Sequence, residues 1–96
     1  MIKIVSKMAV KPGNVEEFKK RIAPLVAASR AEAGNIQYTL NQHLSEPETL
    51  TFLEIWKDQD AINEHVHSEH FTTIFPTLME LCGDPIPVEL YEEIEF

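Results

Sequence analysis

Four segments of the chain alternate apolar and polar residues with a period of two, the pattern of a β-strand with one face on a core. The segments are residues 2–10, 35–44, 49–57 and 88–96. The third differs from the others, because Leu50, Phe52 and Trp56 share one face. Leu53 and Ile55 are apolar on the opposite face. A strand that is apolar on both faces is expected to be covered on both.

Residues 15–32 carry apolar side chains every three to four positions, which predicts an amphipathic helix. Asn14 is expected to cap this helix, with Glu17 as the partner in a capping box. Pro24 removes one backbone hydrogen bond, so it is expected to kink or split the helix. Gly34 suits the position just after the helix end.

Two shorter helices are predicted between the third and fourth strands. The first begins at Asp58 or Asp60, and the second covers residues 69–82, with Ser68 as its N-cap. Pro76 is expected to distort the second of these helices.

The element order β-α-β-β-α-α-β predicts an α+β fold, the ferredoxin-like split βαβ, with its second helix broken in two. Residues 1–96 are expected to form one domain with a four-stranded, antiparallel sheet. A short turn at residues 45–48 joins the second and third strands as a hairpin. Strands 2–10 and 49–57 are expected to pair in parallel at the centre of the sheet. The helices cover one sheet face, and a second copy of the chain is expected to cover the other, giving a homodimer.

The chain has 16 acidic and 8 basic residues and a net charge of −8. This charge argues against nucleic acid or an anionic membrane as partner, since both need a cationic surface. No apolar run approaches the ~20 residues of a membrane span, and residues 1–13 are not expected to act as a signal peptide. Cys82, the single cysteine, lies in an apolar run and is expected to be a buried, unreactive thiol in a reducing compartment. We therefore expect a cytoplasmic protein.

A second pattern begins at the end of the third strand. An acidic residue and a tryptophan are followed by an alanine, a histidine, a serine and a second histidine that opens a helix: Glu54, Trp56, Ala61, His65, Ser68, His70 and Phe71. Together with a Glu-x-Gly lead into the second strand, in residues 32–38, this pattern resembles the antibiotic biosynthesis monooxygenase (ABM) family of ferredoxin-like domains. The resemblance covers almost the whole chain. It implies a dimeric α/β barrel and, in some members, oxygenation of phenols or quinols without a cofactor.

Haem-degrading members of this family use an asparagine in the first strand, a tryptophan after the third strand and a histidine that binds iron. By spacing, the tryptophan position falls on His65 and the iron-binding position on Phe75. Residues 2–10 contain no asparagine. Haem degradation is therefore not expected.

His65, His67 and His70 lie within six positions of one another. Two histidines of a helical metal site lie three or four residues apart, so that both rings reach one point. His65 lies two residues from His67 and five from His70, and a cap at Ser68 is expected to bend the chain before His70, so no metal site is predicted. His67 is expected to be a solvated residue at a helix end. The chain has no glycine-rich phosphate loop or dinucleotide fingerprint, so no cofactor is expected.

His65 and His70 can point inward if the chain turns at Ser68, and histidine is a natural base for a phenol or an enolisable ketone. Glu54 lies on an otherwise apolar strand face and needs a partner, for which His65 or His70 is the expected donor. We predict His65 as the base and His70 and Glu54 as its catalytic partners. Purely structural roles remain an alternative for all three.

The expected substrate contacts are of two kinds. The indole N–H of Trp56 and the side chain of Asn41 are candidate polar contacts. An aromatic pocket wall is expected from Tyr38, Phe52, Phe71 and Phe75. Each of these six residues also has a structural interpretation, with Asn41 exposed on a polar strand face and the aromatic residues in the core.

The favoured function is cofactor-independent monooxygenation of a quinol-like or phenolic small molecule. An isomerase, or another enzyme that enolises a small carbonyl compound, would use the same base. The third hypothesis is a non-catalytic dimeric module that binds a hydrophobic ligand.

Overall fold

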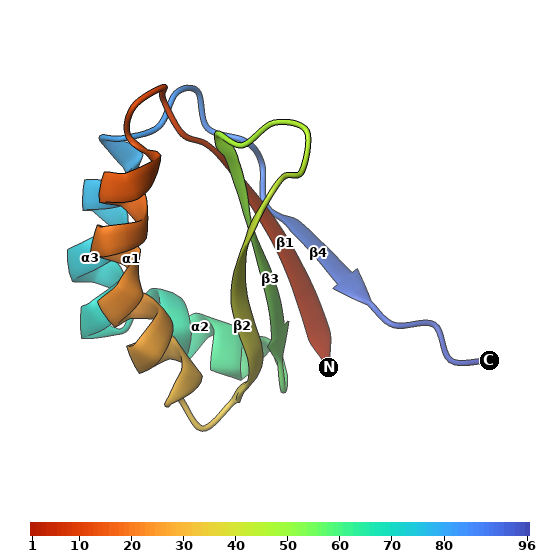
Figure 1. Ribbon diagram of the computed structural model, residues 1–96. Coiled ribbons are helices and arrows are strands. Elements are labelled where there is room, and N and C mark those ends of the chain that lie inside the picture. The colour runs from red at the N-terminus through yellow and green to blue at the C-terminus, as the bar shows by residue number, and fades with distance from the viewer.

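The structure, a computed structural model, describes residues 1–96 and contains four strands and three helices. The elements are β1 (Ile2–Ala9), α1 (Val15–Arg30), β2 (Asn35–Gln42), β3 (Thr49–Trp56), α2 (Gln59–Val66), α3 (Glu69–Met79) and β4 (Glu89–Glu92). All three helices lie on one face of the sheet, and the other face is open (Figure 1). This order confirms the predicted α+β, ferredoxin-like fold. No helix has both the length and the apolar character needed to cross a membrane.

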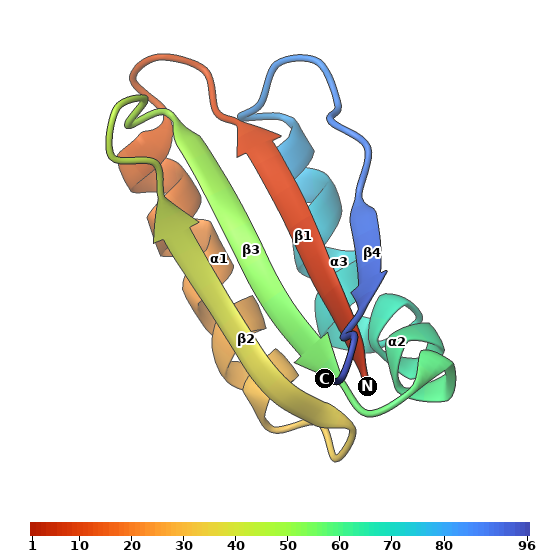
Figure 2. The same cartoon turned by 90° about the vertical axis from the view of Figure 1, so that its right-hand side faces the viewer.

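The sheet has the strand order β2-β3-β1-β4, and every neighbouring pair is antiparallel. The predicted parallel pairing of β1 and β3 is wrong, because Ile2 pairs with Trp56 and Ala9 with Thr49. The helix α1 returns the chain, so β1 and β2 run in the same direction, and the hairpin then reverses β3 (Figure 2). β1 therefore lies between two strands that run opposite to it.

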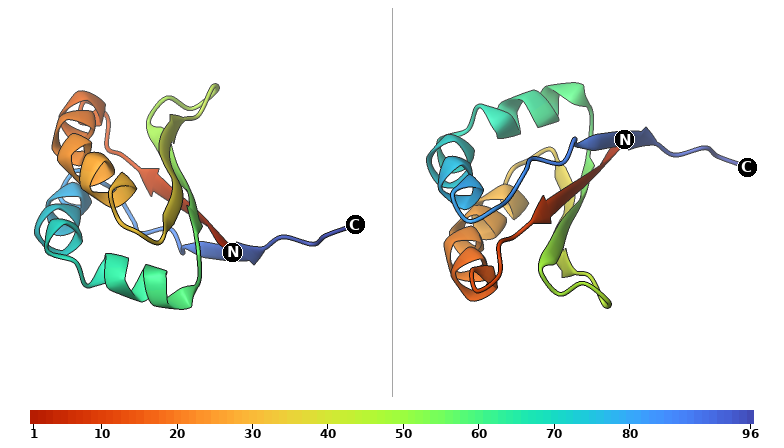
Figure 3. Two further views of the ribbon diagram at one scale, coloured as in Figure 1. Left: turned by 90° about the horizontal axis from the view of Figure 1, so that it is seen from below. Right: turned by 90° about the horizontal axis from the view of Figure 1, so that it is seen from above.

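The two faces of the central strands are buried to different degrees. Leu50, Phe52 and Trp56 of β3 are buried against the helices, as the alternation predicts. On the opposite face Leu53 keeps 38% of its surface exposed, and Ile55 is partly buried. Viewed along the sheet, the helices form one layer and nothing covers the second face (Figure 3). One chain therefore buries only one of the two faces of β3 that its sequence predicts to be buried.

Helix α1 is continuous through Pro24, so the predicted split does not occur. Pro24 lies on the exposed side, where water can hydrate the carbonyl of Lys20 that lacks a partner. The predicted capping box is also absent, since Asn14 makes no cap hydrogen bond. Its side-chain amide instead donates to the carbonyl oxygen of Leu81, at 3.3 Å, and ties the start of α1 to the end of the α3 segment.

The N-cap of the second short helix is as predicted, and the first begins after Asp58, one of the two starts that the sequence offered. Asp58 accepts a hydrogen bond from the backbone N–H of Ala61, and Ser68 accepts one from the N–H of Phe71. Pro76 lies inside α3 without ending it. Cys82 is buried as expected, and burial raises the pKa of its thiol, which keeps it protonated.

The final strand is shorter than predicted. β4 ends at Glu92, which pairs with Ile2, the first residue of β1. Beyond that point β1 offers no further partner, so residues 93–96 leave the sheet, and the C-terminus projects away from it (Figure 1). Four apolar side chains in this region are exposed, Val88, Leu90, Ile94 and Phe96.

Candidate active site

A cavity of about 90 Å³ lies between the helix-facing side of the sheet and helices α2 and α3. Most of its walls are apolar, and three polar side chains interrupt them: Ser6, Glu54 and His65. The predicted aromatic wall is present, since the lining includes Tyr38, Phe52, Phe71 and Phe75. The cavity thus brings together six of the nine residues predicted from the sequence.

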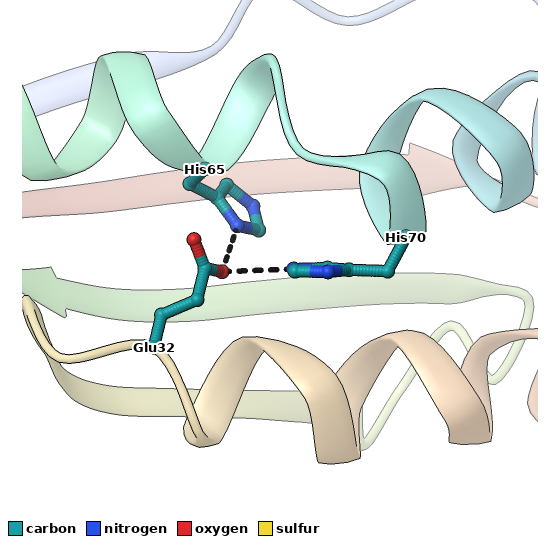
Figure 4. A group of neighbouring side chains, drawn as sticks. All are labelled: Glu32, His65 and His70. Carbon is teal, nitrogen blue, oxygen red and sulfur yellow. Dashed lines mark hydrogen bonds and ion pairs between the residues drawn. The ribbon is translucent and has the colours of Figure 1, made fainter.

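Next to this cavity, one carboxylate oxygen joins the two candidate histidines. Glu32 Oε2 lies 2.7 Å from His65 Nδ1 and 3.0 Å from His70 Nε2 (Figure 4). The three side chains come from different elements, Glu32 from the turn after α1, His65 from the end of α2 and His70 from the start of α3. An ionised carboxylate only accepts hydrogen bonds, so each of these two nitrogens donates.

The environment of His65 favours its neutral form. Its side chain is 3% exposed, and its ring centroid lies 4.5 Å from Trp56 and 5.0 Å from Phe71. Burial lowers the pKa of His65 below its ordinary value of 6.5, although the hydrogen bond and charge of Glu32 oppose this shift. With Nδ1 donating to Glu32, Nε2 of the neutral ring is free to accept a proton.

Glu54 has a different partner from the one predicted. Trp56 Nε1 donates to Glu54 Oε1 at 2.8 Å, whereas His65 and His70 are both bonded to Glu32. Two residues apart on one strand, Glu54 and Trp56 share a face and lie side by side. Burial raises the pKa of Glu54 to about 7, the charge of Glu32 adds to this rise, and the Trp56 bond opposes it. The carboxyl of Glu54 can therefore hold or release a proton near neutral pH.

Three other predicted polar residues lie away from the cavity. Trp56 is fully buried and its N–H is already bonded to Glu54, so it does not contact the cavity directly. Asn41 is exposed on the open sheet face, where its amide donates to Thr39 and Thr51. His70 does not line the cavity, but it contacts Glu32, and its side chain is 24% exposed.

Sequence reasoning missed Glu32 as a site residue, although the Glu-x-Gly segment contained the signal. A Cβ atom on Gly34 would collide with the side chain of Ala61, so only glycine lets this turn approach α2 so closely. The close approach carries the Glu32 carboxylate to His65. Gly34 and Ala61, both noted in the sequence pattern, are therefore the residues that let the turn after α1 lie close enough to α2 for Glu32 to reach His65.

The donor atoms of Glu32, His65 and His70 all lie within 4.8 Å of one another. The spacing rule applies to histidines on one helix, whereas the turn at Ser68 between α2 and α3 brings His65 and His70 to the same carboxylate. Imidazole and carboxylate are ligands for zinc and related divalent ions. His67 takes no part, since it is exposed and bonded to the carbonyl oxygen of Asn63, as expected for a helix end.

Comparison with known proteins gives consistent matches over the chain. A family model described as antibiotic biosynthesis monooxygenase matches residues 1–76. The curated protein "Putative monooxygenase YcnE" of Bacillus subtilis is 39% identical over 88 residues, covering 92% of this chain and 93% of its own. A solved structure of a conserved protein from Methanosarcina mazei Go1 has a TM-score of 0.94 at 38% identity, covering 97% of this chain and 92% of that one. Another, described as an antibiotic biosynthesis monooxygenase, has a TM-score of 0.94 at 25% identity, covering 99% and 100%.

Proposed function

Because the chain belongs to the antibiotic biosynthesis monooxygenase family, we propose that it oxygenates a phenolic or quinol-like small molecule without a bound cofactor. One observation supports this proposal above the others: the same apolar cavity is lined by the buried imidazole of His65, whose pKa is lowered, and by the carboxyl of Glu54, whose pKa is about 7. Apolar walls suit an aromatic ring, and the two titratable groups suit proton transfer near neutral pH.

In the first step of the proposed reaction, His65 takes the proton of the phenolic hydroxyl. Nδ1 stays bonded to Glu32, so Nε2 is the accepting atom. The imidazolium that forms lies next to the Glu32 carboxylate, whose negative charge stabilises it. His70 donates to the same oxygen and holds the carboxylate in place, which makes it a positioning residue.

The phenolate then passes an electron to dioxygen, and the two radicals join at a ring carbon to form a peroxide. His65 returns its proton to the peroxide, and loss of the ring C–H proton expels hydroxide. One phenol and one dioxygen thus give one quinone and one water, and no external reductant is needed. Glu54, when protonated, is the proposed hydrogen-bond donor to the developing peroxide anion.

We further propose that the protein acts as a homodimer in the cytoplasm, with the open sheet faces of two copies packed together. The support is the apolar surface on the open face of β3, where Leu53 is exposed and Ile55 is only partly buried. A chain of 96 residues buries a modest share of its surface, and a second copy adds apolar burial.

Oxygen uptake with a panel of hydroquinones and naphthols tests the proposed reaction. His65→Gln is expected to lower kcat/KM by on the order of a hundredfold or more, because the base is lost. His67→Gln is the matched control, since it changes an exposed histidine two residues away whose ring is bonded to the Asn63 carbonyl oxygen, and it should leave kcat/KM unchanged. Circular dichroism checks that both variants fold.

Three outcomes would overturn the proposal. Turnover that is unaffected by His65→Gln would remove the base from the mechanism. Deuterium exchange at a carbon next to a carbonyl, without oxygen uptake, would identify an enolising enzyme instead. Saturable binding of the aromatic panel with no turnover of any member would identify a ligand-binding module.

Dialysis against a chelator tests the absence of a metal requirement. The proposed steps use only side chains of the chain, so oxygen uptake should be unchanged after dialysis. Loss of uptake, with recovery on adding a divalent ion, would show that Glu32, His65 and His70 work as metal ligands rather than as a proton relay.

A further inference from the structure

A second cavity, of about 210 Å³, lies along the edge of β1 just before the start of β4. Its floor is the helix-facing side of β1 and its sides are α3 and the segment 83–88. Apolar side chains form most of the wall, among them Met8, Phe75, Met79 and Ile86. It is more than twice the size of the cavity that contains His65 and Glu54.

The cavity exists because the sheet opens at this edge, and two prolines explain the opening. The ladder between β1 and β4 stops where Val5 pairs with Glu89. In the same register Pro87 would lie opposite Lys7 and Pro85 opposite Ala9, and neither proline has an N–H to donate. The carbonyl of Ala9 instead accepts from Gly83, at 2.8 Å. Residues 84–88 therefore pass beside β1 without pairing with it.

The two cavities are neighbours along β1. Ser6, Phe75 and Val88 line both of them. A ligand at His65 and Glu54 therefore has the second cavity beside it, between α3 and the segment 83–88. We call this second space, lined by Met8, Phe75, Met79 and Ile86, the side channel.

The size of the first cavity requires such an extension for a larger substrate. At about 90 Å³ it is smaller than the engineered cavity of about 150 Å³ that holds one benzene molecule. With the side channel, the space approaches the lower end of the range of about 300–1,000 Å³ that is usual for small-molecule sites. A single aromatic ring at His65 and Glu54 already needs part of the neighbouring space, and an elongated molecule would fill both cavities.

We propose that the side channel binds the aliphatic tail of a phenolic or quinol substrate whose ring lies at His65 and Glu54. This inference rests on the proposed function for the ring end, and it adds the substrate class. The walls argue for a flexible hydrocarbon rather than a second charged group, because methionines and Ile86 offer adaptable apolar contact. The charged residues of the lining, Lys7 and Asp84, are exposed to solvent.

Binding of 4-alkylphenols, from methyl to hexyl, measured in the absence of dioxygen, tests the side channel without turnover. Measured by calorimetry, the Kd is expected to fall about fourfold for each added methylene until the channel is full. A Kd that does not change with chain length would overturn the proposal.

Ile86→Trp is the variant that should fill the side channel. Ile86 is 38% exposed, so its replacement spares the core. We expect the variant to bind 4-methylphenol with the same Kd as the parent, within about twofold, and to lose the gain from longer chains. Ile36→Trp, on β2, changes an isoleucine outside both cavities and should keep the full dependence on chain length. If the Kd of Ile86→Trp still falls with chain length as in the parent, the alkyl tail does not bind in this channel.

The outcome also separates this inference from the proposed function. Tighter binding of longer chains without oxygen uptake by any phenol would leave the side channel in place and reject the monooxygenase. Oxygen uptake with an affinity that is independent of chain length would support the monooxygenase and reject the side channel.

Discussion

At the scale of single residues, Glu32 fixes which nitrogen of each imidazole is free. Its Oε2 accepts from His65 Nδ1 and His70 Nε2, so His65 is left with Nε2 and His70 with Nδ1. The same carboxylate joins the turn after α1 to both α2 and α3. Its removal should therefore change the proton chemistry more than the packing of the core.

Glu32→Gln is expected to lower kcat/KM by on the order of a hundredfold, with little change in KM. Glutamine keeps the size of the side chain, but it lacks the negative charge that stabilises the His65 imidazolium. The pKa of His65 should fall further, so the acid limb of the pH profile moves to lower pH. The pH dependence of oxygen uptake measures both effects. A purely structural role for Glu32 would leave the position of the acid limb unchanged.

Glu54 should make the protein less stable as the pH rises. Its pKa is about 7 in the folded chain against an ordinary 4.5, so the folded state binds more protons between these values. The free energy of unfolding therefore falls as the pH rises through this window, by on the order of 2–3 kcal/mol from this group. The groups facing Glu54 are Trp56, Tyr38, Glu32 and, across the cavity, His65.

Urea unfolding of the parent and of Glu54→Gln, at pH 5 and pH 8, isolates this effect. The glutamine variant lacks the titration and can still accept from Trp56, so its stability relative to the parent should be higher at pH 8 than at pH 5. His65 has a lowered pKa and contributes a slope of the opposite sign, which is present in both proteins and cancels in the difference. An equal difference at the two pH values would contradict the raised pKa.

At the scale of secondary-structure elements, Ser68 controls how α2 meets α3. Its hydroxyl donates to the carbonyl oxygen of His65 at 2.6 Å and accepts from the N–H of Phe71 at 3.2 Å. One side chain thus caps the end of the first helix and the start of the second. The turn between them places His65 and His70 on the same carboxylate.

Ser68→Ala should cost about 1 kcal/mol of stability, because α3 loses its N-cap. Ser68→Thr keeps a hydroxyl at this position and is the matched control. Urea unfolding measures the loss, and the imidazole NMR signals of His70 report whether its contact with Glu32 is weakened. Unchanged stability together with unchanged His70 signals would show that the turn does not depend on this cap.

At the scale of the whole molecule, the open sheet face is the main feature that one chain leaves unexplained. Leu53 lies at its centre, opposite Val5 on β1 and Thr39 on β2. A mainly apolar central strand that faces water is unfavourable in an isolated monomer. The proposed second copy would bury this surface.

Leu53→Lys should weaken or abolish the dimer, because it places a charge in the middle of the proposed interface. Leu44→Lys adds the same charge in a fully exposed loop and should have no effect on assembly. Sedimentation velocity at micromolar concentration measures both variants and the parent. A parent protein that sediments as a folded species of 11.0 kDa would reject the homodimer.

How much the sequence could predict also depends on scale. Local patterns predicted the strands, the helices and the cap at Ser68 correctly, because each depends on residues close together in the chain. The length of β4 and the direction of β3 relative to β1 were predicted wrongly. Both depend on where a distant strand begins or which way the chain returns, and no local pattern encodes these.

By itself, the sequence determined the fold class and most of the cavity wall, since alternation on β3 and helical spacing on α3 fix which side chains face inward. Only the tertiary structure decided the partners of the polar groups. It paired Glu54 with Trp56 and brought Glu32 to His65 and His70, from 33 and 38 residues away. The physical reason is that a hydrogen bond needs atoms within about 3 Å. Such contacts are set by how a glycine turn and a helix break pack together, and sequence spacing alone does not contain that distance.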